Sequence, residues 1–93
     1  MARKRSIVHI GGKRWRLLRC RVPSDRYGDC CYTTSTIRVS DKLHGDELLN
    51  VLLHELIHAR WPDVSEEAVI EFADELSGVL HAEGFRQPDD HEE

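Results

Sequence analysis

The sequence predicts an α+β domain, in which a small, antiparallel-rich sheet of about three strands packs on a buried helix and a second, C-terminal helix. Three observations favour this class. A Gly11-Gly12 pair separates two apolar-rich stretches, residues 33–40 are rich in β-branched side chains, and helical patterns follow from about residue 46. A chain of 93 residues is long enough for one such domain.

The N-terminal part of the chain predicts the strands. Residues 7–10 and 15–22 are expected to pair through a tight turn at Gly11-Gly12, because glycines readily adopt the positive φ angles of hairpin turns. Residues 23–29 contain Pro, Ser, Asp and Gly, which is typical of a turn. The third strand is expected over residues 33–40.

The C-terminal part predicts two helices. From about residue 46 to residue 60, apolar side chains surround nearly the whole helical circumference, which is typical of a central, buried helix that ends before Pro62. The second helix should begin near Ser65, a residue type favoured at the N-cap, and stop at Gly84. Its apolar residues should form one stripe against the first helix: Val69, Phe72, Ala73, Leu76, Val79 and Leu80.

Composition narrows the class further. Hydrophobic residues make up 40% of the chain and charged residues 32%, as in ordinary globular proteins. No apolar run reaches the length of a membrane span, and no signal peptide is recognisable, so we expect a cytoplasmic protein without a membrane partner. Three cysteines without a CxxC spacing predict free thiols. A single domain is expected over residues 1–86, followed by a disordered acidic tail over residues 87–93.

Charge is distributed unevenly along the chain. Residues 1–21 contain eight Lys or Arg and no acid, whereas residues 22–93 contain five Lys or Arg and seventeen Asp or Glu. This asymmetry fits a solvated strand face that complements an acidic helical half, which we expect. The alternative is an anion-binding face formed by the basic residues 3–21, with nucleic acid as the partner.

The segment His54-Glu55-Leu56-Ile57-His58 is an HExxH motif inside the predicted buried helix. Residues i and i+4 share one helix face, so His54 and His58 can bind one Zn²⁺ ion together. Glu55 lies beside the metal and can accept a proton from zinc-activated water, which is the chemistry of peptide hydrolysis. The remaining histidines lack ligand spacing and predict surface or capping roles: His9, His44, His81 and His91.

A catalytic zinc requires a third protein ligand. The short connection at Pro62 brings the first turn of the second helix beside His58, so Glu66 and Glu67 are both candidates. Asp63, or a residue of a partner chain, remains a further alternative.

The segment Glu67-Ala68-Val69-Ile70-Glu71 resembles the gluzincin arrangement of zinc peptidases. This resemblance implies that Glu67 is the third ligand and that Glu71 supports a ligand histidine. The order of strand, HExxH helix and Glu-bearing helix over residues 36–80 also resembles ImmA/IrrE-type and SprT-like peptidases, and most closely small, phage-type predicted metallopeptidases. A zinc metallopeptidase with a protein or peptide substrate is therefore implied.

The same resemblance implies that the strand before the HExxH helix, residues 36–40, is an edge strand that pairs with an extended substrate; an ordinary structural strand is the alternative. The scissile carbonyl could be polarised by Tyr27, Tyr32 or Arg38, although surface roles are expected for all three.

Two other functions stay open. The first is a nucleic-acid-binding module that uses the basic hairpin and Trp15 and has a structural zinc. The second is a protein whose zinc site is closed and which acts through protein contacts.

Overall fold

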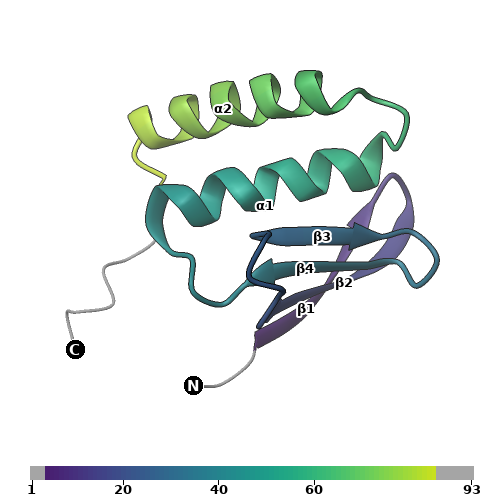
Figure 1. Cartoon of the computed structure of the whole chain (residues 1–93). Helices are drawn as coiled ribbons and strands as arrows, with labels where there is room; N and C mark the ends of the chain where they lie inside the picture. The colour runs from purple at the N-terminus through teal and green to yellow at the C-terminus, as the bar shows by residue number, and fades with distance from the viewer. Residues whose placement is uncertain (1–3, 86–93) are drawn as a thin grey trace.

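The computed structural model describes residues 4–85 and has the predicted α+β class (Figure 1). Its elements follow the order β1 (Lys4–Ile10), β2 (Lys13–Cys20), β3 (Gly28–Cys31), β4 (Thr36–Ser40), α1 (Gly45–Arg60) and α2 (Glu66–Ala82). Helix α1 lies between the sheet and α2, and both helices are on the same side of the sheet. The acidic tail expected over residues 87–93, and the end of the domain expected at residue 86, lie outside the described residues.

The four strands form one mixed sheet in the order β1-β2-β4-β3. Strands β1 and β2 are antiparallel, β2 and β4 are parallel, and β4 and β3 are antiparallel. The predicted hairpin between β1 and β2 is present: Gly11 and Gly12 have φ angles of 60° and 79°, the left-handed values of a tight hairpin turn. Two of the three strand pairs are antiparallel, as expected.

Strand β3 is an addition to the predicted sheet, because residues 28 and 29 were expected in a turn. Glycine and aspartate are depleted in strands. Here they are held by tertiary contacts: β3 pairs with β4 over four residues, and Asp29 binds the Arg38 guanidinium on the neighbouring strand. The addition changes the topology, since β4 lies between β2 and β3. The expectation that residues 36–40 form an edge strand is therefore wrong; β3 occupies that edge.

The main core lies between the sheet and α1. It is formed by buried side chains of β2, β4, α1 and the connection before α1: Trp15, Ile37, Val39, Leu43, Leu48 and Ala59. Trp15, Ile37 and Val39 are at most 2% exposed. Because successive strand residues face opposite sides, Arg38 lies on the sheet face opposite Ile37 and Val39, away from α1.

Helix α2 covers the outer side of α1 and contacts no strand. It begins as predicted after Ser65, whose Oγ accepts a hydrogen bond from the Ala68 amide at 3.2 Å. It ends before Gly84, which has a φ of 95°. Val69 and Ala73 are fully buried against Ile57 of α1.

The predicted apolar stripe of α2 is only partly buried. Phe72 is 43% exposed and Val79 is 60% exposed, contrary to the expectation that they face α1. The reason is that α2 packs against one helix alone, so a narrow seam suffices to cover the contact. Neither helix of residues 4–85 combines the length and the apolar character that a membrane crossing requires.

Candidate metal centre and active site

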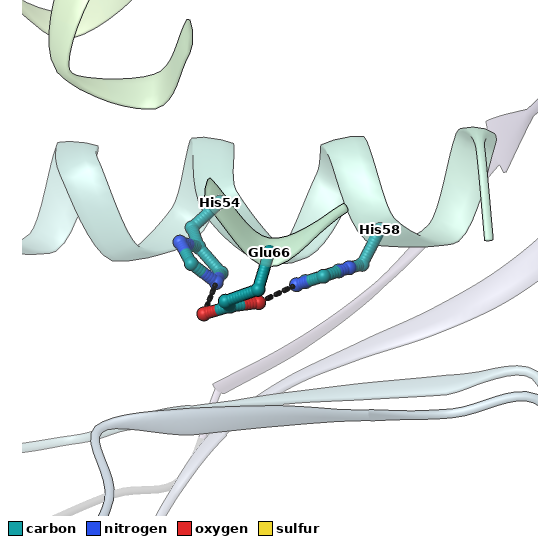
Figure 2. Close-up of side chains that lie close together, drawn as sticks. All are labelled: His54, His58 and Glu66. Carbon is teal, nitrogen blue, oxygen red and sulfur yellow. Dashed lines mark hydrogen bonds and ion pairs between the residues drawn. The ribbon is translucent and has the colours of Figure 1, made fainter. Parts of the chain in front are cut away.

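His54 and His58 are on the same face of α1, one turn apart, and point towards the start of α2 (Figure 2). Their ring centroids are 4.8 Å apart. Both side chains are about one fifth exposed, so the rings are held by their surroundings, and His54 lines a cavity. The i, i+4 spacing of the HExxH motif thus produces the convergent pair of imidazoles that it predicts.

Glu66 completes the group from the first residue of α2. One carboxylate oxygen, Oε1, lies 2.8 Å from Nε2 of His58, and the other, Oε2, lies 3.2 Å from Nε2 of His54. Figure 2 shows the carboxylate lying between the two rings. The Ser65 cap fixes where α2 begins, so Glu66 is its first residue.

The three side chains fit a zinc ion. Two imidazoles and one carboxylate are a donor set that catalytic zinc uses. Bonds of about 2.0–2.2 Å in tetrahedral geometry place ligand atoms about 3.3 Å apart. The two nitrogens and one carboxylate oxygen all lie within 4.8 Å of one another. Side-chain shifts of about 1 Å are therefore enough to bring all three onto one ion, and the same donor set would also accept other divalent metals.

The structure does not place Glu67 in this group, although the resemblance to gluzincins implied that it was the third ligand. Glu67 is exposed, and Glu66 occupies the position between the histidines. Adjacent helical residues point about 100° apart, so the two acids cannot both face His58. In the structure Glu66, one residue before the expected ligand, takes the position beside the two histidines. Glu71, expected to support a ligand histidine, is likewise exposed and outside the group.

Glu55 is 7% exposed and lines the same cavity as His54 and Glu66. Burial raises the pKa of its carboxyl group to about 7, and the negative charges of Asp29 and Glu66 add to this effect, while His58 opposes it. A carboxylate with a pKa near neutrality can both accept and return a proton at physiological pH. The position and the pKa of Glu55 match those of a general base.

The cavity at this site has a volume of about 330 Å³. One wall is formed by His54, Glu55 and Val51 of α1, and Glu66 contributes from α2. The opposite wall comes from Tyr27 and Gly28, at the start of the edge strand β3. A substrate entering the cavity would therefore lie between α1 and the free edge of the sheet.

The three candidates for polarising a carbonyl have different surroundings. Tyr27 is 66% exposed and lines the cavity. The Tyr32 hydroxyl donates a hydrogen bond to the main-chain carbonyl of His58 at 2.9 Å, and burial raises its pKa to about 12, which keeps it protonated. Arg38 binds Asp29 on the far face of the sheet and has no access to the site.

Sequence reasoning did not identify Asn50 or Gly28 as part of the cavity. Asn50 precedes His54 by four residues, so the helical period carried this signal. Gly28 had no such signal, because its place beside Val51 and Glu55 results from the tertiary pairing of β3.

The other histidines and cysteines lie outside the metal group. Nδ1 of His81 lies 2.9 Å from Oδ1 of Asp46, within hydrogen-bonding distance. His44 is the residue before α1, His9 is exposed, and His91 is outside the described residues. Asp63, the further candidate ligand, is exposed and outside the group. The three cysteines are free, as expected.

Comparisons of the chain with protein-family models, with curated proteins and with solved structures found no match.

Proposed function

We propose that this protein is a zinc-dependent peptidase in which His54, His58 and Glu66 hold the metal and Glu55 is the general base. The observation that carries the proposal is that His54, His58 and Glu66 form one group of metal-ligand atoms, and that Glu55 lines the same cavity as two of them, His54 and Glu66. An HExxH motif alone can arise by chance. Here the third ligand is an acidic side chain from another helix, and the motif glutamate is buried with a raised pKa. This combination arises by chance far less often than the motif alone.

Zinc bound at this site would supply Lewis acidity, which makes water a stronger nucleophile at neutral pH and polarises a carbonyl group. The chain itself supplies the proton transfer. Glu55 would accept the proton of the attacking water and pass it to the amine that leaves. In the metal-free site, burial raises the pKa of this carboxyl group to about 7, so it holds a proton more firmly than an ordinary glutamate.

The free edge of β3 supports a peptide as the substrate. The Tyr27 carbonyl accepts a hydrogen bond from the Ser40 amide, so Tyr27, Asp29 and Cys31 direct their main-chain groups towards β4. The alternate residues, Gly28 and Cys30, direct theirs outwards from the sheet edge. An extended peptide could add to this edge as a further strand, with its main chain passing the cavity that contains Glu55.

The test is digestion of an unfolded protein by the zinc-loaded chain, with new termini identified by mass spectrometry. We expect cleavage by the parent protein and its loss in Glu55→Gln, whose amide is nearly isosteric but cannot accept the proton. Zinc content and circular dichroism of the variant should match the parent. Equal cleavage by both proteins would exclude Glu55 as the base. Absence of cleavage by the zinc-loaded parent would favour a protein that acts through contacts alone.

A second candidate function, binding of nucleic acid, is favoured by the sheet face that the helices leave open. Arg5, Arg14 and Arg16 are exposed, and the strand alternation places all three on the face opposite the core residues Val8 and Trp15. Neither β1 nor β2 contains an acidic residue. Lysine and arginine on such a face can neutralise phosphates.

Binding of a labelled 20-nucleotide single strand and a 20-base-pair duplex would test this function. We expect affinity to fall steeply with salt and to weaken in Arg5→Ala/Arg14→Ala. A Lys42→Ala/Arg60→Ala variant, which removes the same charge from the connection before α1 and from the end of α1, is the control. Equal losses in the two variants would mean that the open face has no special role.

We also propose that the protein works in a reducing compartment, the cytoplasm, where free thiols persist. Titration of the protein, purified without reductant from cytoplasm, should yield three reactive thiols per chain once it is unfolded. A lower number, with a disulfide found by mass spectrometry, would contradict this assignment.

A further inference from the structure

A second cavity, with a volume of about 430 Å³, continues the candidate active site along α1. The two cavities share Tyr27, Asn50 and Val51. Asn50 and Val51 lie three and four residues after Glu47 and four and three residues before His54, so the four residues form one stripe of the helix surface. The cavities are thus two parts of one groove between α2 and the start of β3.

The walls of this second cavity are mainly apolar, with Asn50 and Ser77 as neutral polar members, and its charges are negative. Leu43, Val51 and Tyr27 supply apolar surface, while Asp46 and Glu47 supply carboxylates. No lysine or arginine of residues 4–85 lines it. Asp46 already pairs with His81, whereas Glu47 is exposed and forms no ion pair within this part of the chain.

We propose that this cavity is the subsite that binds a lysine or arginine side chain of the peptide substrate, with the Glu47 carboxylate facing the cationic group. Long basic side chains have an apolar stem and a charged end, which matches apolar walls that lead to a carboxylate. The inference rests on the proposed peptidase function, because it names a substrate preference of that site.

The geometry limits where the basic residue lies in the substrate. Glu47 and His54 are seven residues apart on α1, which corresponds to about 10 Å along the helix axis. An extended peptide advances about 3.3 Å per residue. The basic residue therefore lies within about three residues of the cleaved bond.

An anionic group is the natural competitor for this cavity, because the N-terminus of α1 carries a partial positive charge. Two carboxylates in the first turn, Asp46 and Glu47, offset that charge. They also repel an incoming carboxylate. The two carboxylates outweigh the partial positive charge of the helix N-terminus, so the cavity favours a cation. Peptides that differ in one charge measure this preference directly.

The test uses decapeptides of one sequence in which each of the three positions on either side of the cleaved bond is, in turn, lysine, norleucine or glutamate. Norleucine keeps the apolar stem of lysine and removes the charge. We expect the zinc-loaded protein to cleave the best lysine peptide about two- to five-fold faster, as kcat/KM, than its norleucine counterpart, as for a partly exposed charge pair. Glu47→Gln should abolish this preference, and 1 M salt should reduce it.

The matched control is Glu75→Gln, which removes the same charge from an exposed position of α2 that lines neither cavity. It should keep the preference. Equal rates for lysine and norleucine, a preference for glutamate, or equal effects of the two variants would overturn the proposal.

A binding measurement separates failure of the subsite from failure of the proposed function. Metal-free, ¹⁵N-labelled protein is titrated with the lysine, norleucine and glutamate peptides, and amide shifts are mapped. The subsite predicts that lysine peptides bind most tightly and shift the amides of Leu43, Glu47 and Val51. If no peptide is cleaved but this pattern is seen, the peptidase function is wrong and the basic-side-chain site stands. Shifts confined to other residues would overturn the site itself.

Discussion

The carboxylate of Glu66 lies 2.8 Å from Nε2 of His58, although the two residues belong to different helices. Seven residues lie between them in the sequence, and the turn at Pro62 brings them together. The contact also connects the motif helix α1 to the cap of α2, because Glu66 is the first residue after Ser65. Metal binding and the packing of the two helices are thus expected to depend on each other.

We expect one zinc per chain and a clear difference between two neighbouring acids. Glu66→Ala removes the carboxylate that lies between the histidines, so zinc affinity should fall by at least tenfold. Glu67→Ala removes an exposed first-turn acid and should change zinc affinity by less than about threefold. Competition titration with a chromophoric chelator measures both.

Two further variants complete this comparison. His54→Ala and His58→Ala should each reduce zinc binding at least as strongly as Glu66→Ala, since each removes one of three ligands. If Glu67→Ala weakened zinc binding more than Glu66→Ala, the register of α2 at the site would be the one the gluzincin resemblance implies.

The Ser65 hydroxyl should affect metal binding without touching the metal. Ser65→Ala deletes the hydrogen bond to the Ala68 amide, which should cost about 1 kcal/mol of unfolding free energy. Fraying of the first turn also releases Glu66, so zinc affinity should fall several-fold. Denaturant unfolding and the chelator titration measure the two effects, and Ser24→Ala, at an exposed loop position, is the control. A loss of stability with unchanged zinc affinity would show that Glu66 is positioned independently of the cap.

The sequence predicted the elements whose signals are local. The Gly11-Gly12 turn, the buried α1 and the Ser65 cap are each encoded within a few residues, and each is present in the structure. Strand β3 was not predicted, because Gly28 and Asp29 favour a turn and only the partner strand β4 makes them extended. The true edge of the sheet was missed for the same reason.

The site also combines one feature that local sequence determines with one that tertiary packing determines. The distance between His54 and His58 follows from the helical period and could be predicted. The choice between Glu66 and Glu67 depends on how α2 is rotated after the turn at Pro62, and a rotation of about 100° exchanges the two residues. Burial of Val69 and Ala73 against α1 sets that rotation. Tertiary packing, rather than local sequence, therefore decides the third member of the group.

Gly28 lets the edge strand approach α1, and its replacement should show this. A Cβ atom at this position would lie 2.8 Å from the Arg38 carbonyl oxygen and 3.4 Å from Cγ of Glu55. Gly28→Ala should therefore displace β3 and destabilise the protein by about 1–3 kcal/mol. In contrast, Gly78→Ala lies in α2 with no atom near its Cβ and should stabilise the protein by about 0.5–1 kcal/mol. Equal effects in urea unfolding would mean that β3 tolerates the displacement.

The buried Glu55 predicts how the stability of the metal-free protein depends on pH. Its pKa is raised from 4.5 in the unfolded chain to about 7 in the folded protein, mainly by burial. Between these two values the folded state holds a proton that the unfolded state has released, so stability falls as pH rises. This loss of folding stability is complete above pH 7 and absent below pH 4.5. Its size is on the order of 3 kcal/mol at most.

Glu55→Gln isolates this contribution, because the amide is neutral at every pH. We expect the metal-free variant to be about as stable as the parent near pH 4.5 and more stable by up to about 3 kcal/mol at pH 8. Urea unfolding of both proteins in the presence of a chelator measures the difference. The neighbouring side chains His54, His58 and Glu66 are present in both proteins. A difference that is constant with pH would mean that Glu55 titrates as an ordinary glutamate. Burial would then not raise the pKa of its carboxyl group towards neutrality.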